Sequence, residues 1–549
     1  MIRRFMPAVC GGLMSLAAHV GAQAAEEPVG LSVLRQSDSL RLEALRQRVQ
    51  PKLGEAEGSA TPSVAAPDTQ DRRCLPAHSV RVAGASLIPD FDLTAWVDAV
   101  PVQGACIAVG DINGLLYKVS TWYLRQGYIT SQPVSFAVND EGVLVIRVLE
   151  GRIDKIVSTD PRISTKGLLN EPDAVLNLRT IEQAASQINR LDSRAIAVDI
   201  EPSDKPGLSI VKLRPQSALP ERDWSVQTSV DNYDARQLSG TVALSMDNLL
   251  GRNDNVYLAH TRELNQHDTV AHAYSALISL PDGFSTYSAT LYQSHSTAST
   301  VDSSEVDSAR TSLSLKWDRV LHRSQSVIAA VSVDVTHDEF AQQIGEVALQ
   351  SSSWNVNHVV LGMTLQHQEA AWSGRLSLQL DHGLGGLGSA ALPQANYNST
   401  AVQGSIKLPL AARWSATWLG NAQYTPDYVP GFKQFWIGGP VQVPGFRHQA
   451  YAGNSGAITQ WQLTWQAPGS GADGLLGKPY THQISLIQTS GWVFGDMQSD
   501  TRKLSSISLQ YGAVWAGLTG VVSWARPLHN SEAGAARHDD WAFWLSHRY

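Results

Sequence analysis

The C-terminal part of the chain, residues 221–549, is a succession of segments in which apolar and polar side chains alternate. A period of two is the pattern of a β-strand with one apolar face and one polar face. One face of such a strand suits lipid and the other suits water. The clearest runs alternate Leu313, Leu315 and Trp317 with Ser312, Ser314, Lys316 and Asp318, Leu376, Leu378 and Leu380 with Arg375, Ser377, Gln379 and Asp381, and Trp414, Ala416 and Trp418 with Ser415 and Thr417.

A soluble β-sandwich shows the same alternation as a transmembrane β-barrel, so strand length, aromatic placement and the C-terminus must distinguish them. The runs reach about ten residues, the length that a tilted strand needs to cross a bilayer. Trp and Tyr recur toward the ends of the runs, as in interfacial girdles. The last strand resembles the terminal signal read by the barrel-assembly machinery, with these residues on one face: Trp541, Phe543, Leu545, His547 and Tyr549.

The number of strands follows from the length of this region. At about 20 residues for a strand and its connection, residues 221–549 hold roughly sixteen antiparallel strands. Hydrocarbon does not tolerate an open sheet edge, so the first strand, near Trp224, is predicted to pair with the last, near Trp541. We therefore predict a closed transmembrane antiparallel β-barrel.

Before the barrel, helical and strand patterns alternate in two small α+β modules, predicted at residues 74–150 and 151–220. In the first module the pattern predicts strands at 79–82 and 143–149 and helices at 91–97 and 111–125. In the second it predicts strands at 152–157, 195–200 and 208–213 and a helix at 180–191.

The N-terminus adds three segments. Residues 1–24 have Arg3 and Arg4, an apolar run and a small-residue cleavage site, which together predict a secretory signal. The apolar run is too short for a transmembrane helix, and no other stretch offers an apolar run of helical spanning length, which excludes an α-helical membrane protein. Residues 25–50 are predicted to contain an amphipathic helix at 31–49. Residues 51–73, rich in Pro, Ala, Gly, Ser and Thr, are predicted to be a linker.

Net charge bears on the possible partners of the chain, and cysteine content bears on a disulfide. The net charge of −8 becomes −10 when Arg3 and Arg4 leave with the signal (−8 − 2), so nothing suggests a nucleic-acid partner. Cys10 leaves with the signal as well, and Cys74 and Cys106 remain in a chain sent to an oxidising compartment. An even number of cysteines after export favours a disulfide between them over two separate buried thiols.

No enzyme motif stands out. Residues 383–388 match G-x-G-x-x-G, but no helix or βαβ unit surrounds them, so a barrel loop is the better interpretation. There is no H-E-x-x-H, G-x-S-x-G, Walker A or paired Cys-x-x-Cys motif, and we expect no catalysis, cofactor or metal. His358, His367 and His382 are interpreted as lumen or interface residues and not as metal ligands.

With these elements in place, the chain resembles the two-partner secretion transporters, which are the haemolysin and filamentous-haemagglutinin secretion proteins among the POTRA-bearing outer-membrane barrels. The resemblance covers nearly the whole mature chain. It rests on the cysteine pair in Cys74-Leu75-Pro76 and Cys106, on residues 124–130 and 148–153 of the modules, on Asp231-Asn232, Gly240, Asp247-Asn248, Gly251 and Asp254 of the first barrel hairpin, and on residues 435–447 with the following 453–456.

Residues 435–447 resemble the long sixth loop of the family, whose tip folds back into the barrel lumen. The tip here is Val443, Pro444, Gly445, Phe446 and Arg447, with Pro444 where the family has arginine. The wall positions that resemble the family's acidic partners are the neutral Gln462 and Thr489. A charged network that loses one partner leaves a costly buried charge, so we predict a neutral lock with hydrogen bonds through Gln462 and Thr489, with Arg447 as a candidate replacement for the arginine.

The resemblance implies a pore that recognises an unfolded exoprotein client, an adhesin, haemolysin or similar β-helical protein, and passes it to the cell surface. Lipid of the outer membrane and the barrel-assembly machinery are the other expected partners. The client is expected to bind exposed strand edges or helix-edge grooves of the modules. The helix at 31–49 would, by resemblance, occupy the lumen at rest; docking to a module is the alternative.

Two other classes of function are compatible with a barrel but fit the rest of the chain less well. An assembly factor that inserts other barrels is the main alternative, but two modules in place of about five disfavour it. A passive porin is disfavoured by the exported region of about 200 residues before the barrel and by the long sixth loop.

Overall fold

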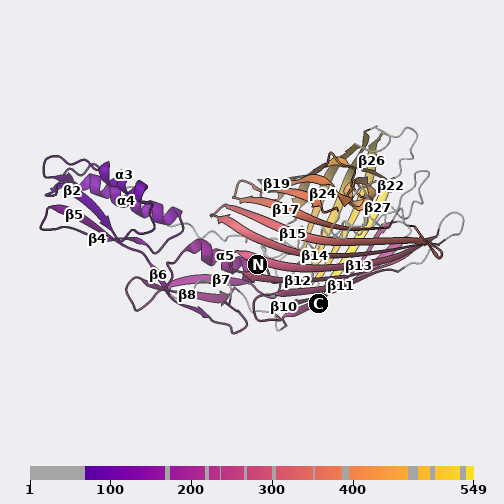
Figure 1. Cartoon of the computed structure of the whole chain (residues 1–549), viewed down its shortest axis with the longest axis horizontal. Coiled ribbons are helices and arrows are strands. Elements are labelled where there is room, and N and C mark those ends of the chain that lie inside the picture. The colour runs from indigo at the N-terminus through magenta and orange to yellow at the C-terminus, as the bar shows by residue number, and fades with distance from the viewer. Residues whose placement is uncertain are drawn as a thin grey trace. The chain divides into compact units, whose positions relative to one another are not determined.

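The computed structural model describes residues 69–166, 173–216, 222–234, 237–264, 269–299, 305–349, 353–385, 395–467, 480–494, 501–531 and 539–549. The predicted signal at 1–24, the helix at 31–49 and the linker up to residue 68 lie outside these ranges and stay predictions. The described residues fall into two compact units, which are the modules and the barrel (Figure 1). None of the described helices is long and apolar enough to cross a bilayer.

The first module packs two helices on a three-stranded sheet of order β2–β5–β4, in which β5 runs parallel to β2 and antiparallel to β4. Ile112, Leu115, Val119 and Tyr123 recur every three or four residues along one helix and are buried, so this helix presents one apolar stripe to the sheet. The elements are β1 (Cys74–Leu75), β2 (Ser79–Ala83), α3 (Asp90–Asp98), β3 (Ile107–Ala108), α4 (Val109–Arg125), β4 (Gln132–Val138) and β5 (Val143–Leu149).

The second module repeats this plan with one described helix. Its sheet has the order β6–β8–β7, with β6 parallel and β7 antiparallel to β8. Ile181, Ala184 and Ile188 of the helix pack against Val211 and Leu213 in one buried cluster. The elements are β6 (Arg152–Ser158), α5 (Leu178–Asn189), β7 (Ile196–Pro202) and β8 (Leu208–Pro215).

In the described residues, sixteen long strands and the two-residue β16 (Val347–Ala348) form a closed antiparallel barrel. The long strands are β9 (Trp224–Asp234), β10 (Gln237–Asp247), β11 (Asn255–Glu263), β12 (Thr269–Asp282), β13 (Ser285–Ser299), β14 (Glu305–Arg323), β15 (Val327–Ile344), β17 (Trp354–Gln368), β18 (Ser373–Gly383), β19 (Asn398–Ala411), β20 (Trp414–Tyr424), β23 (Ser455–Gln466), β24 (Tyr480–Phe494), β25 (Arg502–Trp515), β26 (Leu518–Asn530) and β27 (Asp540–Arg548).

The predicted closure is confirmed, because β9 pairs with β27 from Gln227–Arg548 to Asp231–Trp544. Beyond that ladder, the backbone N–H groups of Val226 and Tyr549 each donate to the carbonyl of the other residue. The seam thus gives both edge strands a hydrogen-bonded partner, as a membrane barrel requires.

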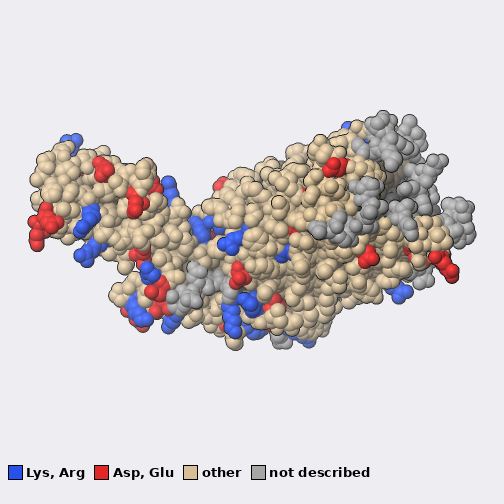
Figure 2. Space-filling model, in the orientation of Figure 1, with Lys and Arg blue, Asp and Glu red and all other residues tan. Residues whose placement is uncertain are grey.

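The two faces of the barrel strands differ as the alternation predicts. On β14 the side chains of Leu313 and Leu315 are exposed, whereas Ser312 and Ser314 are buried inside the barrel. In β27, Trp541 and Leu545 point outward. The middle of the barrel face shown in Figure 2 carries few charged side chains, which suits contact with lipid.

Sequence reasoning missed the edge strand β4, whose segment begins Gln132-Pro133. Proline argues against a central strand, but it is tolerated at an edge, where its missing N–H costs no ladder bond. The register indeed shifts between Pro133 and Ser135, which marks an irregularity at the start of the strand.

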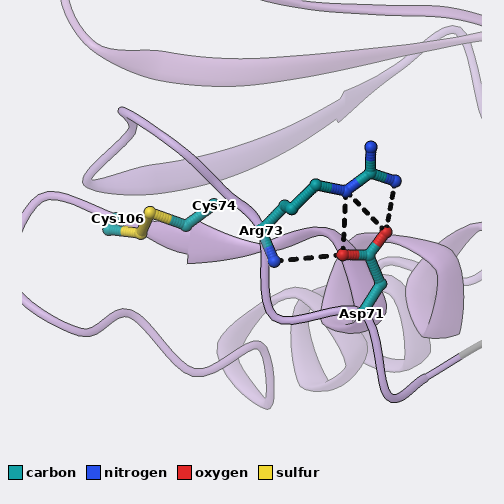
Figure 3. Close-up of a disulfide and its surroundings, with 4 residues drawn as sticks. All are labelled: Asp71, Arg73, Cys74 and Cys106. Carbon is teal, nitrogen blue, oxygen red and sulfur yellow. Dashed lines mark hydrogen bonds and ion pairs between the residues drawn. A yellow bond between two sulfur atoms is a disulfide. The ribbon is translucent and has the colours of Figure 1, made fainter.

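A disulfide joins Cys74 to Cys106, as predicted, with their Cα atoms 5.6 Å apart (Figure 3). It lies beside a short antiparallel ladder in which β1 pairs with β3 and Cys74 faces Ala108. Just before it, the guanidinium of Arg73 donates to the carboxylate of Asp71, at 2.6 Å for the shortest contact. The disulfide, the ladder and the N–H groups of Val109 and Gly110, which donate to the carbonyls of Arg73 and Asp71, fasten the N-terminal end of the first module to the start of α4.

We expect the double substitution C74S/C106S to destabilise the first module by about 3 to 4 kcal/mol, because the crosslink spans 32 residues and its loss frees the unfolded chain. For a module of this size the melting temperature should fall by roughly 10 °C or more. Calorimetry of the full-length protein in detergent measures the transition.

The exposed A105S is the matched control and should melt like the wild type. Dithiothreitol should lower the transition of the wild type and leave that of C74S/C106S unchanged. Equal melting temperatures for the wild type and the double variant would show that the disulfide adds no stability.

Candidate functional site

The turn after α4 joins the two modules and contains the residues 124–130 singled out in the sequence. Gly127 has φ +90°, a left-handed conformation that suits glycine at the end of a helix. Tyr128 then turns back onto the helix, where its ring lies parallel to that of Trp122 at 6.3 Å and edge-on to that of Tyr123 at 6.1 Å. The motif therefore ends the helix and packs the ring of Tyr128 against two aromatic rings of that helix.

Hydrogen bonds from this turn hold the second module. The N–H of Leu178 donates to the carbonyl of Gly127 at 2.8 Å, and the side-chain amide of Asn177 donates to the carbonyl of Gln126 at 3.1 Å. The oxygen of the same amide accepts from the N–H of Arg179 and caps α5. Gly151 completes the joint, since a Cβ there would lie 2.2 Å from Oγ1 of Thr130.

Glu150 is the polar centre of the joint. Its carboxylate accepts hydrogen bonds from the hydroxyl of Ser86 at 2.6 Å, the hydroxyl of Tyr123 at 2.8 Å and the N–H of Leu87 at 2.9 Å. Burial by itself raises the pKa of the Glu150 carboxyl, but these donors outweigh burial and hold it below its ordinary value. The fully buried Tyr123 has its pKa raised by burial and by this carboxylate.

The second candidate site is the sixth loop of the barrel, residues 425–454. It contains β21 (Phe435–Gly438), the short helix α6 (Gly439–Gln442) and β22 (Phe446–Gly453). β21 and β22 form an antiparallel hairpin of their own. The tip residues Val443 and Phe446 are buried, at 0% and 3% exposure.

The hairpin packs on the lumen side of the barrel wall. Its side chains share one apolar cluster with inward-facing residues of β24 and β25, made of Phe435, Ile437, Val443, Phe446, Val493 and Leu504. Gly491 of β24 leaves room for the tip, because a Cβ there would lie 2.8 Å from Cγ2 of Ile437. Gly445 has φ +94°, and a Cβ there would lie 3.2 Å from the ring of Pro527 on β26.

The predicted lock through Gln462 and Thr489 is wrong in its hydrogen bonds. The side-chain amide of Gln462 donates to Thr464 and Ser485, both on barrel strands. Thr489 is fully buried on the lumen face, yet its hydroxyl has no hydrogen-bond partner among the described residues. The side chain of Arg447 lies outside the described part of the structure, so its role stays a prediction.

Apolar packing and hydrogen bonds to a side-chain amide hold the hairpin instead. The side-chain amide of Asn530 on β26 donates to Oε1 of Gln449 at 2.7 Å, and its oxygen accepts from the hydroxyl of Tyr451 at 3.2 Å. No sequence signal pointed to Asn530, since nothing in the pattern shows which distant strand faces the loop. These two hydrogen bonds are neutral, but the guanidinium of Arg502 also lies over the ring of Tyr451 at 5.5 Å, so the neutral lock of the loop stays a prediction.

The three histidines weighed as metal ligands have other contacts. His358 is fully buried between the carboxylates of Asp338 and Asp381, and the ring of His367 stacks on that of Trp372 at 4.0 Å. Nδ1 of His382 lies 3.0 Å from Oδ1 of Asn398, which can only accept a hydrogen bond. Gly383 ends β18, and residues 386–394, with the rest of the G-x-G-x-x-G match, lie outside the described residues.

Comparison with known proteins agrees with this architecture. Residues 75–151 match the description "POTRA domain, ShlB-type", residues 152–202 match "POTRA domain", and residues 207–513 match "Haemolysin secretion/activation protein ShlB/FhaC/HecB". POTRA modules ahead of a closed sixteen-strand barrel define a POTRA-bearing outer-membrane transporter. Within that class, the chain belongs to the ShlB/FhaC/HecB family of haemolysin secretion and activation proteins.

Individual relatives cover most of the chain. It is 30% identical over 429 residues to the outer membrane transporter CdiB of Dickeya dadantii (strain 3937), which is 72% of this chain and 73% of that protein. It is 29% identical to the hemolysin transporter protein HpmB of Proteus mirabilis, over the same shares. The structure of CdiB from Escherichia coli has the same fold, with TM-score 0.82, 23% identity and coverage of 96% of this chain and 100% of that one.

The chain is thus an outer-membrane transporter of two-partner secretion whose POTRA modules lie in the periplasm, and it pairs with a secreted exoprotein. The expected family, fold class, location and function are confirmed.

The first prediction from these sites concerns pH. Because the folded-state pKa of Glu150 lies below its ordinary 4.5, its stabilising effect is full above that value and is lost as the pH falls below it. E150Q should lower the melting temperature of the POTRA unit at pH 7 and flatten its fall over the acid range below pH 4.5. Calorimetry across this range measures both effects, with the exposed E141Q as control. A parallel pH profile for E150Q and wild type would contradict the assignment.

The second prediction concerns the seat of the loop tip. G491A should destabilise the hairpin contact by about 1 kcal/mol and G491V by up to about 3 kcal/mol, because each overpacks the space against Ile437 and Val443. Protease cleavage of the sixth loop in the folded barrel measures the change. G512A is the matched control, since a Cβ there makes its nearest contact at 3.5 Å. Cleavage as slow in G491V as in G512A would mean that the tip rests elsewhere.

Proposed function

We propose that the first POTRA module captures its exoprotein client as an extended segment that adds itself to the edge strand β4. The observation that carries this proposal is an apolar edge: Val134 and Phe136 are 53% and 51% exposed on a strand whose described ladder is with β5 alone. An edge strand offers free backbone donors and acceptors, and its exposed side chains supply affinity for apolar residues of the client.

The geometry of Phe136 supports this proposal. Phe136 lies directly across the ladder from Ile146, which is fully buried under the helices. Side chains at paired positions point to the same face, so Phe136 also points to the helix-covered side. It is half exposed because no further described strand follows β4. A client strand beside β4 would bury this ring and extend the core of the module.

The lumen of the barrel supplies the path of the client. A barrel of sixteen strands is wide enough for an aqueous channel, and its lumen face is polar, with buried serine and threonine side chains. The hairpin of the sixth loop occupies part of this lumen, so an extended client passes only where the hairpin yields space. Folding of the client outside buries apolar surface and disfavours its return.

The client itself, we propose, is a large β-rich exoprotein of the adhesin or haemolysin kind. Such a client suits strand addition, because its sequence is rich in segments that pair as strands while still unfolded. Two relatives in the family are named for haemolysin transport, HpmB and ShlB. The apolar outer wall of the barrel faces membrane lipid.

Glutamate at the edge tests the recognition step. V134E/F136E should weaken binding of the client on the order of tenfold or more and reduce its secretion in proportion, because buried apolar contact is lost at the edge. Secretion is measured in the culture medium, and binding is measured on the purified full-length transporter.

F91E is the matched control, since Phe91 is an 84% exposed aromatic on α3 of the same module. It should leave both binding and secretion unchanged. Normal secretion by a correctly inserted V134E/F136E transporter would place client recognition elsewhere, and an equal loss in F91E would indicate a general effect of charge.

A further inference from the structure

A chain of polar and charged side chains crosses the lumen face of the barrel, and its wall residues lie on strands that do not touch the loop tip. Nη2 of Arg310 lies 3.1 Å from Oδ1 of Asp338, and Oδ2 of Asp338 lies 3.1 Å from Nε2 of His358. Nδ1 of His358 lies 3.0 Å from Oδ1 of Asp381, and Oδ2 of Asp381 lies 2.6 Å from Nζ of Lys433. The exposed fractions of these side chains run from 0% to 16%.

Lys433 differs from the other four residues because it belongs to the sixth loop and not to the wall. It ends a 3-10 turn, Gly431–Lys433, directly before the hairpin. Its carbonyl accepts from the side-chain amide of Gln423, which also donates to the carbonyl of Asn454 at the far end of the loop. The ammonium of Lys433 is therefore carried at the base of the loop, where its two arms meet.

An apolar contact accompanies the ion pair. Val429 is fully buried in a cluster with residues of β15 and β17, and the hydroxyl of Tyr397 in the same cluster donates to Asp381 at 3.3 Å. The carboxylate of Asp427 accepts from the N–H of Asn398 at 2.7 Å. The first arm of the loop thus rests on β15–β19, whereas the tip rests on β24–β26.

The two contacts lie on different sectors of the wall. Going round the barrel, β20 and β23 separate β19 from β24 on one side, and β27 with β9–β13 separates β26 from β14 on the other. A loop seated on both sectors bridges part of the lumen. It cannot leave the lumen as a unit without separating Lys433 from Asp381.

We propose that the Lys433–Asp381 ion pair is the electrostatic anchor that holds the sixth loop inside the barrel at rest, and that the buried Arg310–Asp338–His358 chain positions Asp381 for it. Separating the pair leaves a poorly hydrated carboxylate on the wall, so the anchor resists displacement more strongly than an exposed pair would. The tip, which is held by apolar packing, then stays in place or moves together with the base of the loop. This proposal concerns the loop alone and does not depend on which client is transported.

Thiol labelling of the tip tests the anchor without a client. Val443 is fully buried against the wall, so V443C with Cys10 replaced by serine reports each time the tip leaves its seat. The folded barrel is confirmed by its heat-modifiable mobility on gels. In full-length protein in liposomes, K433M and the isosteric D381N should each raise the labelling rate by roughly tenfold. Each should also raise the frequency of large openings in planar bilayers.

Three further variants make the test specific. K433R keeps the charge and should label slowly. K316M removes a lumen ion pair of the same kind, Lys316–Asp318 at 2.8 Å, which lies within β14 and does not touch the loop, so it too should label slowly. K433M/D381N should label no faster than the faster single variant, because the pair acts as a unit. Wild-type labelling in K433M or D381N, or an equal rise in K316M, overturns the proposal.

Discussion

A barrel of sixteen strands encloses more space than its inward-pointing side chains can fill, and much of the structure follows from that constraint. The wall meets it with small polar residues such as Ser312, Thr336 and Ser508, which leave a hydrophilic lumen. The remaining space admits a hairpin that is itself part of the chain. The sixth loop therefore belongs to the interior of the barrel as much as to its surface.

Two kinds of force hold that hairpin. At the tip, glycines at 445 and 491 allow backbone and side chains to approach closely, so packing supplies the contact. At the base, the ammonium of Lys433 meets the carboxylate of Asp381, and both are mostly shielded from water. Packing falls off within a fraction of an ångström, whereas a charge pair in a medium of low polarity acts over a longer range. The contact at the tip is therefore lost after a small displacement, whereas the ion pair at the base still acts after a larger one.

Sequence patterns predicted the parts that depend on local physics. Period-two alternation identified the strands and their outward faces, and the 3.6 spacing located α3, α4 and α5 within one or two residues of their ends. The cysteine pair followed from the count and the compartment. The Pro133 edge strand was missed because proline hides an edge strand from such rules.

The sequence did not reveal which residues meet across the lumen. Gln462 and Thr489 were chosen by their position in a motif, but the bonds to the hairpin come from Asn530, which lies on another strand. Lys433, Asp381 and His358 come from three separate segments. Pairing of β17 with β18 brings His358 beside Asp381, and the fold of the sixth loop into the lumen adds Lys433. Contacts of this kind depend on strand register and barrel curvature, which no periodicity encodes.

Closure also has a bearing on the order of folding. The seam joins Gln227 to Ser546, which are 319 residues apart in the chain. Such a distant pairing is expected to form late. The chain loses the entropy of closing this long loop before the contacts at the seam can stabilise it. The POTRA modules, whose contacts are local, can fold first, while both barrel edges still await their partners. The new barrel thus passes through a stage with two exposed strand edges, the stage at which it most needs protection from unintended pairing.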